Sequence, residues 1–314
     1  METNKTKNQT NKFLIGGAPV EIKSEWIDEN KARVNRFRPN LIRQSALTKL
    51  KYYCSICLII KDENEYLEEW LRWHIGQGVQ HFYIYDNASK HPVLDFIETL
   101  CSSVASKVTV VDWGGTYKNA QPEAYNDCLR RFDTQSRWIG FIDADEQVRL
   151  RIGNSLQNFL MRYENFAGVM AMWKEYGANG QKNKSDLPLR KRFTKMSKHQ
   201  SKLGKVFVQP LFMDSMYIHN GVPKEGFEVV DEYFLPMAEL AIGKKSNVTT
   251  DFICVDHYYT KSYEEWIEKL KRGRCHLIHG RKYDEFFLYN PDMKYCKEDI
   301  EIKQEYAVYN KEEI

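Results

Sequence analysis

The sequence has no long apolar stretch, since no uninterrupted run approaches the roughly 18 residues that a membrane-spanning helix needs. Residues 1–11 are polar and lack the apolar core of a secretory signal. Lys and Arg exceed Asp and Glu by only 46 to 43, which is too small an excess to indicate a nucleic-acid partner. The seven cysteines are odd in number and show no disulfide spacing. We therefore expect a cytoplasmic protein that binds no nucleic acid.

Strands and helices alternate from about residue 53 onward. The first helix carries Leu67, Trp70, Leu71 and His74 on one apolar face, so His74 is interpreted as a structural residue. Regular alternation of this kind is typical of a mostly parallel α/β sheet with right-handed crossovers. The strands expected from the apolar runs are 54–60, 81–85, 108–111 and 138–142.

Each of these four strands is followed at once by polar or acidic residues. Because the carboxyl ends of parallel strands meet at one edge of a sheet, and ligands bind at that edge, the side chains should face a common site. Carboxylates are not needed there by the fold itself, so their repetition favours a functional edge. The segments are Lys61-Asp62-Glu63, Asp86-Asn87, Asp112-Trp113 and Asp143-Ala144-Asp145.

Asp143 and Asp145 form an Asp-x-Asp pair at the end of the fourth strand. Taken alone, such a tripeptide is more often a solvated turn than a site. Two converging carboxylates would however suit a hard cation such as Mg²⁺ or Mn²⁺ with its diphosphate. A later strand, 252–255, is followed by His257, which could complete the shell; His219 is an alternative ligand.

The stretch 182–205 is strongly basic, with nine Lys or Arg residues against one acid, Asp186. A solvated loop explains such a run, and an anion-facing surface is the alternative.

The motifs together resemble glycosyltransferase family 92 and its bacterial family-2-like relatives, over residues 53–305. The resemblance is carried by the order and spacing of several segments, each modest alone. They are residues 61–70, 78–87, Gln121 with 124–128, 138–146 and 257–262, with weaker similarity at 192–195, Lys205 and Pro210.

The resemblance implies a fold of GT-A type and a metal-dependent, inverting transfer of a hexose, of galactose or glucose type, from a UDP-sugar to a hydroxyl. Mn²⁺ or Mg²⁺ would be the cofactor, and a glycan or lipid-linked acceptor of surface polysaccharide or lipopolysaccharide synthesis the partner, with peripheral membrane contact. Residues 51–150 would form the nucleotide-sugar half, 151–314 the acceptor and C-terminal half, and 1–50 a partly disordered extension. The implied donor-binding residues are Lys61, Glu63, Asp86, Asn87, Asp143, Lys261 and Arg272, and the implied metal ligands are Asp143, Asp145 and His257.

Two points stay open at this level. An inverting transfer needs a general base, and Glu175 and Asp186 are candidates because they follow the strand after the Asp-x-Asp pair. Residues 176–180 depart from the family pattern, which leaves the acceptor undefined. The alternative function is a catalytically weak nucleotide- or carbohydrate-binding module on the same fold.

Overall fold

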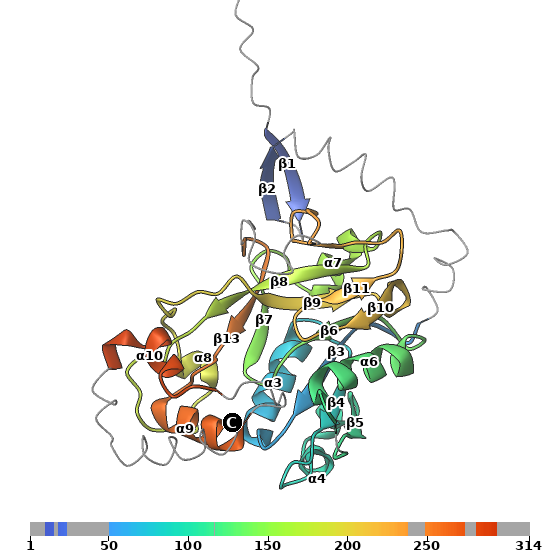
Figure 1. Ribbon diagram of the computed structural model, residues 1–314. Helices are drawn as coiled ribbons and strands as arrows, with labels where there is room; N and C mark the ends of the chain where they lie inside the picture. The colour runs from blue at the N-terminus through green and yellow to red at the C-terminus, as the bar shows by residue number, and fades with distance from the viewer. Residues whose placement is uncertain are drawn as a thin grey trace, which may run out of the picture.

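The computed structural model describes residues 10–15, 18–23, 50–115, 117–237, 249–273 and 281–293. Its centre is a nine-stranded sheet in the order β5-β4-β3-β6-β9-β8-β13-β7, with β12 paired to β8 (Figure 1). The strands are β3 (Tyr52–Ile60), β4 (His81–Asp86), β5 (Val108–Asp112), β6 (Ser136–Phe141), β7 (Glu146–Leu150), β8 (Gly168–Glu175), β9 (Gly204–Val208), β12 (Val229–Val230) and β13 (Ile253–His257). Two hairpins, β1 (Thr10–Ile15) with β2 (Ala18–Lys23) and β10 (Met213–Met216) with β11 (Gly221–Pro223), are separate.

Helices flank this sheet on both faces, as expected for the α/β class. The α-helices are α3 (Asn64–Gly76), α4 (Val93–Glu98), α5 (Ser102–Ala105), α6 (Ala120–Phe132), α7 (Leu156–Leu160), α8 (Leu189–Arg192), α9 (Tyr263–Arg272) and α10 (Glu285–Tyr289). One apolar cluster joins α3, α4 and α7 to the sheet, and a second joins α6 to the other face. Cys54 belongs to the first cluster and Cys57 to the second, because side chains near each other on a strand can face opposite ways.

The pairing of β3, β4, β5 and β6 is parallel throughout, as the sequence predicts. Antiparallel pairing enters with β9 and β7, so five of the eight pairings among the described strands of this sheet are parallel. Strand β7 is missing from the sequence-based expectation. Its polar sequence is compatible with a strand because Arg149 forms an ion pair with Asp256 of β13, at 2.6 Å.

Strand β13 lies between β7 and β8, and this pairing brings distant residues together. His257 is in register with Glu146 on β7 and with Glu175 on β8. The same strand leads directly into α9 through Tyr258–Ser262. At the left of Figure 1, α8, α9 and α10 gather at this end of the sheet, away from β5 and α4.

Helix α9 is fixed by one buried carboxylate, that of Glu265. Its capping box with Ser262 is present, as the Ser-x-x-Glu spacing predicts. The same carboxylate accepts two hydrogen bonds from Arg192 of α8, at 3.0 and 2.5 Å, and one from the Tyr66 hydroxyl of α3 at 2.6 Å. Both side chains of the Arg192–Glu265 pair are only 2% exposed. The Glu265 carboxylate therefore links three helices that are far apart in sequence, α3, α8 and α9.

Replacing Arg192 with Met should leave Glu265 buried without its cation. We expect the free energy of unfolding to fall by about 3–5 kcal/mol, the usual cost of breaking a buried ion pair on one side. Urea unfolding checks this, with Lys191→Met, an exposed neighbour on α8, as the matched control. A loss no larger than that of the control would contradict the role given to Glu265.

The same pair predicts a pH dependence. Burial alone would raise the pKa of Glu265, but hydrogen bonds from Arg192, Ser262 and Tyr66 outweigh it and lower the pKa to about 2. Stability gained from this carboxylate is therefore complete above its ordinary pKa of 4.5 and is lost as the pH falls toward 2. Thermal unfolding of the wild type and Glu265→Gln should differ most at neutral pH and converge in acid; a constant difference would refute the assignment.

Candidate active site

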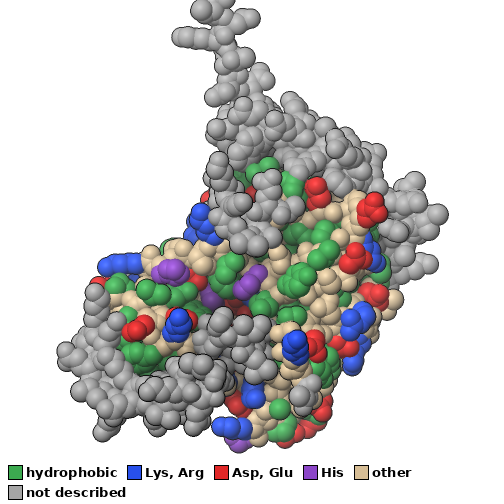
Figure 2. Space-filling model, in the orientation of Figure 1, with side chains coloured by type: hydrophobic (Ala, Val, Ile, Leu, Met, Phe, Trp, Pro, Cys, Tyr) green, Lys and Arg blue, Asp and Glu red, His purple; other side chains and the backbone are tan. Residues whose placement is uncertain are grey.

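A cavity of about 450 Å³ opens where the strands end, with carboxylates, cations and aromatic rings in its wall. In Figure 2, histidine and acidic side chains lie together near the middle of the visible face. Of the site residues expected from sequence, Lys61, Glu63, Asn87, Asp143, Asp145, His257 and Arg272 line this cavity. Lys261 instead lines a neighbouring cavity of about 300 Å³, which shares Glu63, Lys269 and Arg272 with the first.

Asp143 is held on both carboxylate oxygens. Oδ1 accepts hydrogen bonds from the Gln121 amide at 2.8 Å and the Tyr125 hydroxyl at 3.0 Å, both from the first turns of α6. Oδ2 accepts from the Lys205 ammonium of β9 at 2.7 Å. The side chain of Asp143 is nevertheless 29% exposed, so this fixed carboxylate presents an acceptor edge to the cavity.

Behind Asp143 lies a second acid, Glu146, which is fully buried. Its Oε2 accepts a hydrogen bond from the Asp143 backbone N–H at 2.8 Å and lies 3.8 Å from Lys205 Nζ. Burial raises the pKa of Glu146 well above its ordinary value despite the nearby Lys205. Lys205 is itself fully buried, and Asp143 and Glu146 raise its pKa against the effect of burial. One ammonium thus pairs with Asp143 and lies close to Glu146 at the end of β6.

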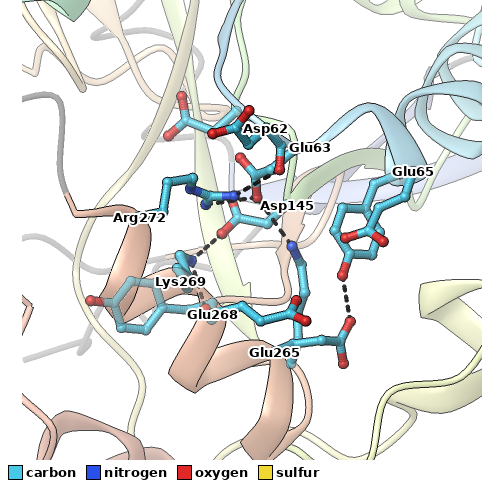
Figure 3. A network of polar contacts seen from close by, with 12 residues as sticks. Asp62, Glu63, Glu65, Asp145, Glu265, Glu268, Lys269 and Arg272 are labelled. Atoms are coloured by element: carbon cyan, nitrogen blue, oxygen red, sulfur yellow. Dashed lines mark hydrogen bonds and ion pairs between the residues drawn. The ribbon is translucent and has the colours of Figure 1, made fainter. Parts of the chain in front are cut away.

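Asp145 is paired differently. Its Oδ2 accepts a hydrogen bond from the Lys269 ammonium of α9 at 2.5 Å (Figure 3). Its Oδ1 lies 3.9 Å from His257 Nε2. Burial would raise the pKa of Asp145, but Lys269, with His257 and Lys261, holds it well below its usual range. Burial in turn lowers the pKa of Lys269 to about 8 although Asp145 is adjacent. The pair is therefore ionised on both sides at neutral pH.

Glu63 carries the third set of ion pairs, at the end of β3. Its Oε1 lies 3.2 Å from Lys261 Nζ and 3.0 Å from the Arg272 guanidinium, which points from α9 into the same network (Figure 3). Burial opposes ionisation of Glu63, but the two cations outweigh it and lower its pKa. Lys261 also lies over the Tyr66 ring, 3.6 Å from its centroid.

Asp86 has a mainly structural position. Its two carboxylate oxygens accept hydrogen bonds from the backbone N–H groups of Ser89 and Val93, which shape the loop into α4. Asn87, the next residue, lines the cavity. Of these two neighbouring residues, both expected from sequence to bind the donor, Asn87 belongs to the cavity wall and Asp86 does not.

The two candidate bases lie outside the cavity wall. Glu175 is buried; its Oε2 accepts a hydrogen bond from Ser201 N at 2.7 Å, and its Oε1 is 3.7 Å from His257 Nδ1. Glu175 therefore stands behind His257, whose other nitrogen faces Asp145. Asp186 is exposed in the basic loop before α8. Of the described residues in the basic stretch 182–205, only Leu203, which follows α8, belongs to the wall of the larger cavity.

His219, the alternative metal ligand, also lines the cavity. Its Nδ1–H donates to the Gly204 carbonyl at 3.2 Å, which leaves Nε2 with its lone pair. Burial lowers the pKa of His219 to about 4, so the imidazole is neutral at pH 7. Trp173 contacts both histidines, with ring centroids 5.1 Å from His219 and 4.2 Å from His257.

The fit of these residues to a divalent cation is partial. Within the described part of the chain, no group of three or more His, Cys, Asp or Glu side chains is arranged to hold a metal ion. Asp143 is engaged on both oxygens, whereas Asp145 and His257 lie together in the cavity wall. One or two protein ligands suffice where phosphate oxygens and water complete the shell. The donor set fits a cation of that kind if the ammonium of Lys269 leaves Asp145.

The loops that carry the site contain backbone in the left-handed region. Asp62, Ala88 and Lys261 have φ of 52°, 53° and 53°, and each lies in a loop that leads from a strand end into a helix. Such a conformation costs a non-glycine residue roughly 1 kcal/mol or more and is found where the surrounding contacts enforce it.

Residues 51–273, well over half of the chain, match the family model of glycosyltransferase family 92. The chain belongs to this family. Membership confirms the resemblance drawn from the motifs, and the helix-flanked, mostly parallel sheet agrees with the GT-A type expected with it.

Curated members of family 92 align over a limited part of their length. One from Ricinus communis is 29% identical over 116 residues, covering 37% of this chain and 20% of the relative. Another, from Oryza sativa subsp. japonica, is 29% identical over 108 residues, covering 34% of this chain and 18% of the relative. The chain therefore spans about a fifth of the length of these relatives. Among solved structures, S. aureus TarS in complex with UDP-GlcNAc is similar with a TM-score of 0.32 and 15% identity, over 42% of this chain and 37% of that chain.

Three functional contacts of this family 92 chain are not evident from sequence. Lys269 lies on an amphipathic helix one turn before Arg272, and that spacing is the signal that could have named it. Gln121 and Tyr125 belong to a recognisable motif, but only the fold shows that they hold Asp143.

Among the described residues, no helix has both the length and the apolar character needed to cross a bilayer.

Lys205→Met should leave Asp143 and Glu146 without their shared cation. We expect the free energy of unfolding to drop by about 1.5–3 kcal/mol, because the partly exposed Asp143 carboxylate loses a charge-assisted hydrogen bond. The double variant Lys205→Met/Asp143→Asn should recover part of this loss, since the charge is removed together with its partner. Urea midpoints of the two variants measure it; a double variant no more stable than Lys205→Met would contradict this account.

Proposed function

We propose that the protein is a metal-dependent, inverting glycosyltransferase that moves a hexose from a UDP-sugar to an acceptor hydroxyl. The observation that carries the proposal is the meeting of Asp143, Asp145, Lys269 and Arg272 in one cavity of a family 92 chain. The cavity volume of about 450 Å³ is within the range of sites for small molecules.

The residues divide by charge and position. Asp143, with its orientation fixed by Gln121 and Lys205, offers an acceptor for ribose hydroxyls, and Asn87 lines the same cavity and would contact the donor. Lys269 and Arg272 carry positive charge where a departing diphosphate would develop negative charge. Stabilisation of the leaving group is therefore the part of catalysis that this site supports best.

Asp145 and His257 are the residues that would hold Mn²⁺ or Mg²⁺ together with the donor phosphates. The bound ion would supply Lewis-acid stabilisation of the leaving diphosphate. Glu175 supports this arrangement from behind by facing His257 Nδ1, and with Asp186 it remains a candidate for the general base that an inverting reaction requires.

The sugar, the acceptor and the cellular setting are further parts of the proposal. We favour galactose or glucose as the transferred hexose and a glycan or glycolipid of surface polysaccharide or lipopolysaccharide as the acceptor. Aromatic side chains line the cavity beside His257, notably Trp173, Tyr259 and Tyr289, and flat rings suit the apolar face of a sugar. We also propose a cytoplasmic location, from which a lipid-linked acceptor would bring the protein to the membrane surface.

Calorimetry with UDP and Mn²⁺ tests the donor site. We expect binding that weakens at least about tenfold in Asp145→Ala, because the cation loses a charged ligand worth about 1.4 kcal/mol or more. Asp95→Ala, an exposed acid on α4, is the control. Absence of binding, or equal affinity in Asp145→Ala and the control, would end the proposal. Release of UDP from a panel of UDP-hexoses then separates a transferase from a binding module.

A further inference from the structure

The contact between Lys269 and Asp145 stands out among the ion pairs of the cavity. Nζ of Lys269 donates to Asp145 Oδ2 at 2.5 Å and to the Tyr259 carbonyl at 2.7 Å, and it lies 4.3 Å from the Tyr259 ring centroid. The Lys269 side chain is 6% exposed and that of Asp145 10%. A cation of the protein itself thus sits on the carboxylate that would serve a metal.

The charges of the cavity wall are already balanced. Within the described residues, four cations line the cavity beside four carboxylates: Lys61, Lys269, Arg272 and Arg281, with Glu63, Asp143, Asp145 and Glu285. Lys205 and Lys261 add two more positive charges in contact with these acids. A divalent cation that entered alone would meet carboxylates whose charge is compensated, and it would be repelled by the nearest ammonium.

A nucleoside diphosphate changes this balance. It brings negative charge that can accept hydrogen bonds from an ammonium as well as ligate a metal. Lys269 and Arg272 are three residues apart on α9 and therefore project from the same face of the helix toward the cavity (Figure 3). A lysine stem has enough rotatable bonds to exchange one neighbouring oxygen for another without movement of its helix.

We propose that Lys269 is a diphosphate-binding residue that competes with the divalent cation for Asp145. In the empty site its ammonium neutralises Asp145, and a nucleoside diphosphate draws the ammonium away and makes Asp145 available to the metal. The proposal rests on the proposed donor site, and it goes beyond it by assigning Lys269 and an order of events. Metal affinity should therefore be low without nucleotide and high with it.

Lys269→Met separates the two roles of this residue. Calorimetry should show Mn²⁺ alone binding about tenfold more tightly to Lys269→Met than to the wild type, because Asp145 loses its resident cation. UDP in EDTA should bind about tenfold more weakly, because a charge-assisted hydrogen bond is lost. Lys51→Met is the control for loss of one charge, because Lys51 is exposed and directly precedes β3, at the end of the strand away from the cavity. Unchanged affinity for both probes, or weaker binding of Mn²⁺ alone, would overturn the proposal.

Asp145→Asn provides the reciprocal test and keeps the side-chain volume if Lys269→Met does not fold. Without Asp145 as competitor, Lys269 is free to serve the diphosphate, so UDP in EDTA should bind more tightly than to the wild type, by up to about tenfold. If Asp145 acted only as a metal ligand, Asp145→Asn would leave the binding of UDP in EDTA unchanged. That result would refute the proposed competition between Lys269 and the metal for Asp145. If the wild type binds neither UDP nor UDP with Mn²⁺, the proposed donor site is wrong. If the wild type binds UDP and both variants bind it with the same affinity, the donor site stands and only the role given to Lys269 is wrong.

Discussion

Compensation of buried carboxylates by buried cations is the constraint on which this structure depends. Glu63, Asp143, Asp145 and Glu265 are all buried or partly buried, and each is matched by a Lys or Arg from another element. An isolated charge in such a position would cost several kcal/mol, whereas a well-bonded pair is tolerated. The ion pairs therefore join α8, α9 and β9 to the rest of the structure, and three of the acids, Glu63, Asp143 and Asp145, also line the cavity.

Much of the fold could be read from the sequence because the signals are local. The apolar runs at 54–60, 81–85 and 138–142 predict β3, β4 and β6, and the Ser262–Glu265 capping box predicts the start of α9. Strand β7 could not be found in this way. Its residues are polar, and it is a strand only because β13, about a hundred residues later, pairs with it.

The site divides in the same manner. The sequence predicts that Asp143, Asp145 and His257 cluster, because each lies at or just after the end of a strand, where ligands bind. What each carboxylate contacts does not follow, because the partners are distant: Lys269 is 124 residues from Asp145, and Lys205 is 62 from Asp143. Asp86 shows a further limit, since a carboxylate at a strand end can accept hydrogen bonds from the backbone of its own loop, which the sequence does not reveal.

The position of β13 between β7 and β8 also limits how this chain can change in length. Asp256 and His257 face opposite sides of the sheet, with Asp256 bound to Arg149 and His257 beside Asp145. Insertion or deletion of one residue within Ile253–His257 would exchange these faces, placing an acid in the cavity and an imidazole against a guanidinium. Variation in length is therefore confined to the connecting loops, while this five-residue strand admits substitution only.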